Sequence, residues 1–139
     1  MYKLPDGQIN IYSFVHPLED MLDPANRWVV RSKSIPWEEL ELHLAARLYS
    51  TRGAPAKAVR MMLGAMMIAD ELGLTDAETV RQIEENPYMQ YFVGYHEFTR
   101  RRPFTPLSLT LFRKRITPPV AREIRRIVKK PRNTEASDV

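Results

Sequence analysis

Cysteine is absent from the 139-residue chain and glycine occurs only five times, and each shortage excludes whole classes of site. Without cysteine there is no disulfide framework, no thiol nucleophile and no thiolate metal site, which suits a reducing compartment. The few glycines form no phosphate-binding loop, dinucleotide-binding loop or nucleophile elbow. The three histidines lack the spacing of metal ligands. The sequence therefore predicts no cofactor, no metal site and no catalytic constellation.

Long apolar runs are missing too. No segment approaches the roughly 18 apolar residues of a membrane span. The first residues, MYKLPDGQINIYSF, lack the basic and apolar regions of a secretory signal. We therefore expect a cytoplasmic, nucleoid-associated protein that does not span a membrane. Neither a membrane nor a small-molecule substrate is its expected partner.

Acidic residues are scarce in the last third of the chain, which makes the charge distribution strongly uneven. Residues 1–97 carry 9 Lys/Arg and 14 Asp/Glu, whereas residues 98–139 carry 12 and 3. The overall charge of +4 thus combines −5 in the first part with +9 in the second. A local excess of this size is typical of a surface that meets a polyanion, although a solubilising tail would look similar.

Hydrophobic spacing of three to four residues predicts an all-α fold. Residues 1–34 contain several prolines and are expected to be an irregular lead-in with one short helix, opened by Asp23 as N-cap and Pro24 as first helical residue. The helical domain proper covers residues 35–116. Its helices are expected at 34–49, 57–72, 75–86, 87–95 and 106–116.

The helix expected at 57–72 is apolar nearly all round, which predicts the buried centre of a small multi-helix domain. Its four methionines could line a ligand pocket, but core filling is the more common use of Met. Gly73 suits a left-handed C-cap, and Thr75 with Glu78 matches a capping box. Helix, tight turn and helix together give a helix-turn-helix-like arrangement.

A basic amphipathic helix is expected over residues 117–130, opened by Thr117 and Pro118. Its apolar stripe comprises Val120, Ile124, Ile127 and Val128. Residues 131–139 are polar and short, and we expect them to form a frayed tail.

The cations of the C-terminal part are candidate DNA contacts, because Lys and Arg neutralise phosphates. Arg100 to Arg102 precede Pro103 and suit a flexible arm along the backbone or into a minor groove. Most of the cations would position the domain on phosphates, and an Arg among them could read guanine. The candidate DNA-binding residues are Arg100, Arg101, Arg102, Arg113, Lys114, Arg115, Arg122, Arg125, Arg126, Lys129 and Lys130.

A series of short motifs resembles the N-terminal domain of bacterial insertion-sequence transposases related to insertion sequence family five. They are an R-G-x-P stretch, a hydrophobic helix, G-L-[ST]-[DE]-x-E, E-N-P, F-x-G and L-x-x-F-R-K-R-[IL]. They lie at Arg52 to Pro55, Val59 to Leu72, Gly73 to Glu78, Glu85 to Pro87, Phe92 to Gly94 and Leu109 to Ile116. With its lead-in, the resemblance covers residues from about Phe14 to Ile116.

The resemblance implies a helical, helix-turn-helix-like module that binds double-stranded DNA at transposon ends and precedes a ribonuclease H-type catalytic domain. It also implies a homodimer or a separate catalytic chain as partner. The sequence departs from the family pattern D-x-S-T-L-x-R-F-R at Thr105, Leu107 and Leu111. Because 139 residues leave no room for the catalytic domain, we expect no enzymatic activity.

Other functions remain open from the sequence alone. A basic amphipathic helix at 117–130 could instead dock in a partner protein's groove or on an anionic membrane. The chain could be a nuclease subunit of a split enzyme, or it could bind RNA, since phosphate contacts do not distinguish the nucleic acids.

Overall fold

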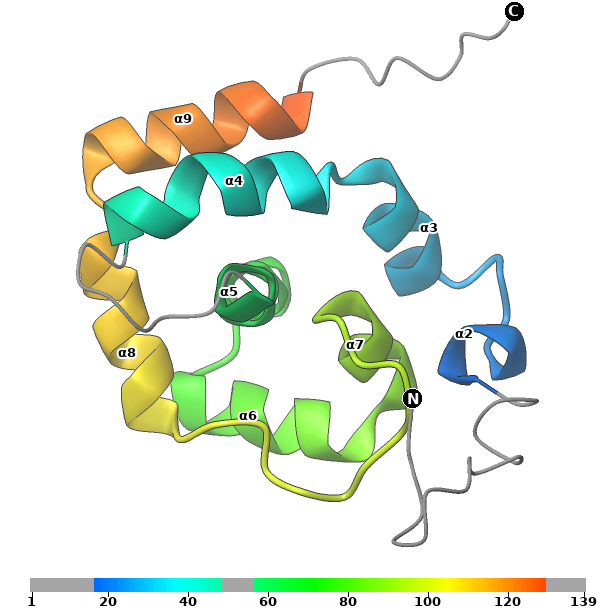
Figure 1. Ribbon diagram of the computed structural model, residues 1–139. Helices are drawn as coiled ribbons and strands as arrows, with labels where there is room; N and C mark the ends of the chain where they lie inside the picture. Colours follow the sequence, from blue (N-terminus) through cyan, green and yellow to red (C-terminus); the bar gives the residue numbers. More distant parts are fainter. Residues whose placement is uncertain (1–16, 49–56, 130–139) are drawn as a thin grey trace, which may run out of the picture.

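The computed structural model describes residues 17–48 and 57–129, and these form helices joined by turns and loops, with no strand (Figure 1). The all-α prediction is therefore confirmed. No helix in the described ranges is long and apolar enough to cross a membrane. The helices are α2 Leu18–Met21, α3 Arg27–Ser34, α4 Trp37–Leu48, α5 Lys57–Leu72, α6 Asp76–Glu85, α7 Pro87–Phe92, α8 Pro106–Arg115 and α9 Pro118–Lys129.

The centre of the domain is α5, which Figure 1 shows end-on with the other helices arranged around it. It packs against α4, α6 and α8, and it buries Val59, Leu63 and Ile68 completely. At Gly64 the helix passes so close to α7 that an added Cβ would lie 3.1 Å from Cγ1 of Val93. The methionines of α5 are buried or packed against this core, as the core-filling interpretation predicts.

The tight turn between α5 and α6 has the predicted chemistry. Gly73 adopts a φ of 68°, the left-handed conformation that ends α5. Thr75 caps α6, because its Oγ1 accepts a hydrogen bond from the Glu78 backbone N–H at 3.0 Å. The later helices begin in a related way, with Asn86 before Pro87 in α7 and Thr105 before Pro106 in α8.

The expected irregular lead-in with one short helix is wrong for residues 17–34, which form both α2 and α3. Asp23 does not cap a helix but accepts from the Ala25 N–H at 2.9 Å in a turn. The N-cap of α3 is Asn26. The helix packs its Trp28 edge-on against Phe92 of α7, with ring centroids 5.1 Å apart. One of its buried positions is a polar residue, Ser32, which interrupts the apolar period in the sequence.

The C-terminal helix α9 lies alongside α4, as Figure 1 shows. Val120, Ile124 and Ile127 of its apolar stripe are buried, so this side of the helix belongs to the core of the domain. Several predictions fall outside the described residues: the first part of the lead-in at 1–16, the R-G-x-P stretch, Lys130, and the frayed tail at 131–139.

The conformation of Gly73 gives a prediction for stability. Open space surrounds the position of an added Cβ, so the cost of a side chain there is conformational and not steric. Gly73→Ala should lower the free energy of unfolding by about 1 kcal/mol, measured by urea denaturation. Gly73→Asn is the control and should lose less, because Asn tolerates the left-handed region. Equal losses for Ala and Asn would contradict this explanation.

Candidate nucleic-acid interface

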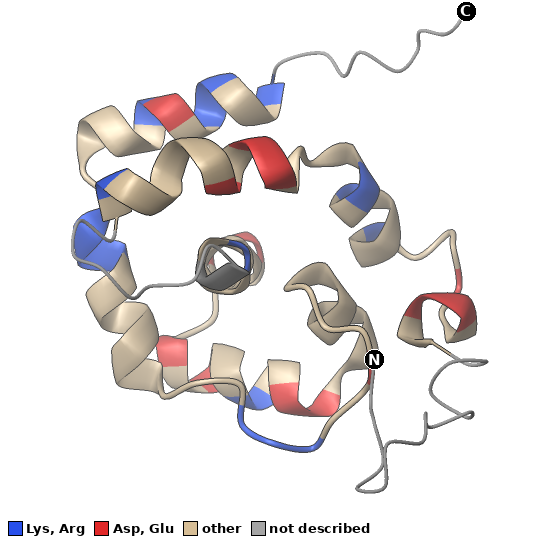
Figure 2. Cartoon of the chain, viewed as in Figure 1, with Lys and Arg blue, Asp and Glu red and all other residues tan. Residues whose placement is uncertain are grey.

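The structure separates the predicted cations into two groups. Figure 2 shows Lys and Arg along α9 and at the adjoining end of α8, and a further group on the loop between α7 and α8, at the opposite edge of this view. We call the first group the α8–α9 edge; it comprises Lys114, Arg115, Arg122, Arg125, Arg126 and Lys129. We call Arg100, Arg101 and Arg102 the arginine loop.

The cations of α9 lie on its outer side, since the apolar stripe occupies the inner side of the helix. Arg126 pairs with Glu123 at 2.8 Å, a surface pair that contributes little to stability. Within the described residues, Arg122, Arg125 and Lys129 have no ion pair. Their charges are therefore available to an external anion.

Arg113 differs from the other candidates because its charge is already compensated. Its Nε lies 3.0 Å from Oδ1 of Asp76 and its Nη1 lies 3.0 Å from Oδ1 of Asp70. Asp76 also accepts from the Thr110 hydroxyl at 2.7 Å. Burial lowers the pKa of Arg113, but the two carboxylates outweigh burial and raise it. Arg113 thus joins α8 to the last turn of α5 and the first turn of α6.

The outward side of α8 is apolar in its first part and basic in its last turn. Its first part exposes Leu107 and Leu111, with 63% and 48% of their surfaces accessible. Its last turn exposes Lys114 and Arg115, and Arg115 donates to the Leu48 carbonyl at 2.6 Å. Cations therefore occupy only the end of α8 that adjoins α9.

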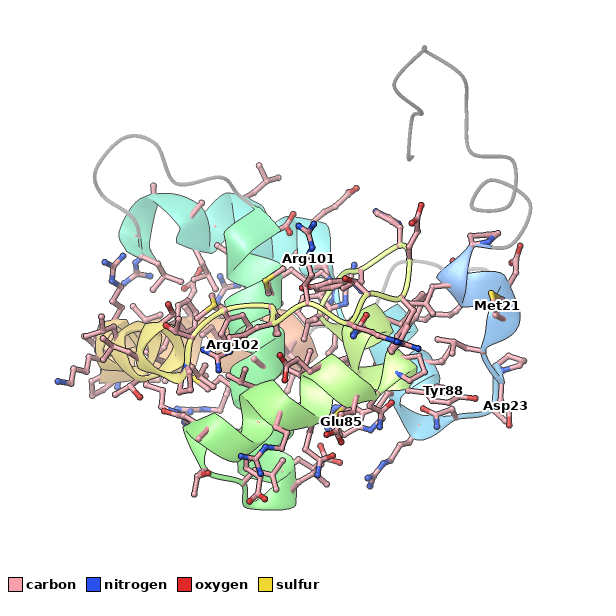
Figure 3. All side chains as sticks on the ribbon, turned by 90° about the horizontal axis from the view of Figure 1, so that it is seen from below. Met21, Asp23, Glu85, Tyr88, Arg101 and Arg102 are labelled. Carbon is pink, nitrogen blue, oxygen red and sulfur yellow. The ribbon has the colours of Figure 1, made fainter. Side chains whose placement is uncertain are left out.

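The arginine loop is anchored by a residue that sequence analysis missed. The side chain of Gln90 is buried, donates to the Thr99 carbonyl at 2.8 Å and accepts from the Thr99 N–H at 3.0 Å. Figure 3 shows Arg101 and Arg102, which follow Thr99 on this loop. All three arginines are exposed and, within the described residues, have no ion pair. The only sequence signal for Gln90 was a single amide within an aromatic helix.

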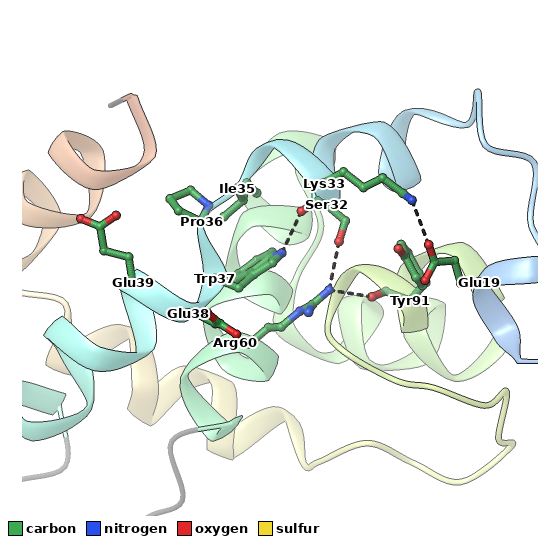
Figure 4. A pocket seen from close by; sticks show the side chains of 10 residues that line it. All are labelled: Glu19, Ser32, Lys33, Ile35, Pro36, Trp37, Glu38, Glu39, Arg60 and Tyr91. Atoms are coloured by element: carbon green, nitrogen blue, oxygen red, sulfur yellow. Dashed lines mark hydrogen bonds and ion pairs between the residues drawn. The ribbon is translucent and has the colours of Figure 1, made fainter. Parts of the chain in front are cut away.

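Arg60 is a second polar residue that the sequence did not reveal as important. Its guanidinium stacks over the Trp37 ring, 4.7 Å from the centroid, at the edge of a hollow (Figure 4). It donates to Ser32 Oγ and to the carbonyls of Tyr91 and Phe92. Burial lowers its pKa. Because these carbonyls end α7, Arg60 compensates a helix C-terminus inside the domain.

In the pair formed by α5, the tight turn and α6, which the sequence predicts to be helix-turn-helix-like, the second helix is acidic. The ten residues of α6 include four carboxylates and one cation, Arg81. Such a helix would meet repulsion from phosphates in a major groove. In the part of the chain that the structure describes, no three His, Asp or Glu side chains come together as a metal site.

Comparison with known proteins identifies the family. Residues 16–115 match the Transposase domain (DUF772) family. The chain is also 33% identical over 101 residues to a Rhizobium meliloti protein called uncharacterized protein ORF8 in nfe locus. This alignment covers 73% of the chain but 48% of the relative, so the chain spans about half the length of that protein. No solved structure matches the chain. The match over most of its residues shows that the chain belongs to the DUF772 transposase domain family.

Proposed function

We propose that this protein is a DNA-binding module of a transposase and that it binds double-stranded DNA at transposon ends without cutting it. The observation that carries the proposal is the set of cations without ion pairs, within the described residues, on the outer side of α9 and on the arginine loop. Family membership supports a role in transposition.

The spacing of the α9 cations suits a row of phosphates. Arg122, Arg125 and Lys129 are three and four residues apart and therefore lie on one side of the helix. The first and the last are seven residues apart, or about 10 Å along the helix axis. One DNA strand presents a phosphate about every 3.4 Å along its axis, so this row could face about three of them.

The main alternative would use the apolar stripe of α9 to dock on a partner protein or a membrane. Ile124 and Ile127 are buried against the rest of the domain, so such docking would require α9 to detach. Contact through the outer, cationic side requires no such change. This difference favours DNA over the alternative.

The acidic character of α6 bears on which helix approaches DNA. In many helix-turn-helix proteins the second helix of the motif enters the major groove. Here Glu78, Glu84 and Glu85 would oppose that approach. We infer that the α8–α9 edge and the arginine loop make the contacts instead.

The catalytic step falls to residues outside this module. We infer that cleavage and strand transfer are carried out by a separate catalytic chain or domain, and that this module acts as a homodimer or alongside that partner. Detection of divalent-metal-dependent DNA cleavage by the purified protein would overturn this part of the proposal.

The direct test is fluorescence anisotropy with a labelled duplex from an element end and a scrambled duplex, at about 50 and 200 mM salt. If six or more phosphates are neutralised, the affinity should fall about a thousandfold or more between these salt concentrations. Tighter binding to the element end would support end recognition. No binding to either duplex at low salt would overturn the proposal.

The α9 row can be tested by removing its charge. In the triple variant Arg122→Gln, Arg125→Gln, Lys129→Gln, the slope of log affinity against log salt should become shallower by about 3, since each phosphate that is no longer neutralised reduces it by roughly 1. Arg27→Gln removes an exposed cation on α3 and is the control, for which the slope should not change. An unchanged slope in the triple variant would exclude α9 from the interface.

Two neighbouring residues of α8 should have different roles: Arg113 should contribute to stability and Lys114 to DNA binding. Arg113→Gln breaks the ion pairs with Asp70 and Asp76, and should lower the free energy of unfolding by about 1 to 2 kcal/mol. Lys114→Gln removes an exposed charge and should weaken DNA binding with little change in stability. Urea denaturation and anisotropy measure the two effects. The reverse pattern would assign Arg113 to the interface.

A further inference from the structure

A buried amide ties the arginine loop to the helical core. Gln90 is 1% exposed and lies in α7, yet its side chain reaches two other parts of the chain. Its Nε2 donates to the Ile83 carbonyl at 2.9 Å and to the Glu84 carbonyl at 3.3 Å, both in the last turn of α6. Its other hydrogen bonds are with the N–H and the carbonyl of Thr99, immediately before the arginines.

The two bonds to Thr99 resemble a short piece of strand pairing. An amide side chain offers an acceptor oxygen and two donor hydrogens, and here it binds both the N–H and the C=O of one residue. This fixes the position and the orientation of the backbone at Thr99. Because Gln90 is fully buried, breaking these hydrogen bonds would leave several polar groups unsatisfied, which is costly in the interior.

The rest of the loop is short and is also held at its far end. The Arg101 N–H donates to the Thr99 hydroxyl at 3.1 Å. At the other end, Phe104 packs against the core and Thr105 caps α8. The arginines therefore lie between two fixed points. This arrangement differs from the flexible arm that the sequence suggested.

We propose that Gln90 is a positioning residue that holds Arg100, Arg101 and Arg102 in one conformation before DNA arrives. The inference rests on the proposed DNA-binding function and adds to it the reason for a buried polar side chain in α7. Three adjacent cations repel one another, and ordering a free loop against DNA costs about 1 to 2 kcal/mol per residue. Because the Gln90 hydrogen bonds already order the loop in the free protein, this conformational entropy is not lost when DNA binds. The contacts between the arginines and DNA therefore contribute more fully to the binding free energy.

The test compares Gln90→Met with Val59→Ala. Met has a similar shape but cannot make the four hydrogen bonds, whereas Val59→Ala removes buried volume in α5 and leaves all four hydrogen bonds in place. Backbone NMR relaxation of the free protein should show Arg100 to Arg102 as rigid as the helices in the wild type and in Val59→Ala. In Gln90→Met the same amides should become mobile.

DNA affinity provides the second measurement. Gln90→Met should bind at least about tenfold more weakly than Val59→Ala, since reordering even one of the three arginines costs about that much. The salt slope should not change, because the same cations touch DNA. Should Gln90→Met fail to fold, two glycines inserted between Thr99 and Arg100 would separate the arginines from their anchor, with the same expected result.

The outcomes distinguish the two proposals. If the wild type does not bind DNA, the proposed function fails, whereas relaxation still shows whether Gln90 orders the loop. If Gln90→Met leaves the arginine amides rigid, or leaves affinity equal to that of Val59→Ala, the positioning role of Gln90 is overturned while DNA binding stands.

Discussion

The structure depends on the burial of one helix, α5, whose apolar residues extend nearly all round its surface. Such a helix must be enclosed by neighbouring helices over most of its surface, and its last turn exposes the charged side chains of Asp70 and Glu71. α4, α6 and α8 pack directly on it, and α7 approaches it closely at Gly64. The inner sides of these helices are buried against α5, whereas their outer sides face solvent and can carry charged residues. The acidic α6 and the α8 helix with its basic last turn can therefore differ in charge without disturbing the core.

Local sequence signals predicted most of this fold because helix ends are encoded in a few adjacent residues. Thr75 and Pro118 marked helix starts that the structure confirms. The local pattern does not predict α3, because this helix is stabilised by packing against α7, which is about 60 residues away in the chain. Local periodicity cannot report such long-range packing, and buried Ser32 further weakened the pattern.

The candidate interface was less predictable, because a set of cations in a sequence does not show which charges are compensated. Arg113 appears equivalent to Lys114 in the sequence, yet it pairs with one carboxylate at the end of α5 and another at the start of α6. Likewise, nothing near Gln90 in the sequence indicates its hydrogen bonds with Thr99. Both relationships link positions that are brought together only by folding. Lys130 lies outside the described residues, so its prediction stays a prediction.

The divided outer side of α8 has a consequence for how the protein behaves in different salts. Lys114 and Arg115 attract anions less strongly as ionic strength rises, because mobile ions screen their charge. Leu107 and Leu111, exposed on the same side, respond in the opposite direction, since salts such as sulfate strengthen apolar association. A single helix thus presents two surfaces with opposite salt responses, and conditions that weaken anion binding at one strengthen apolar association at the other.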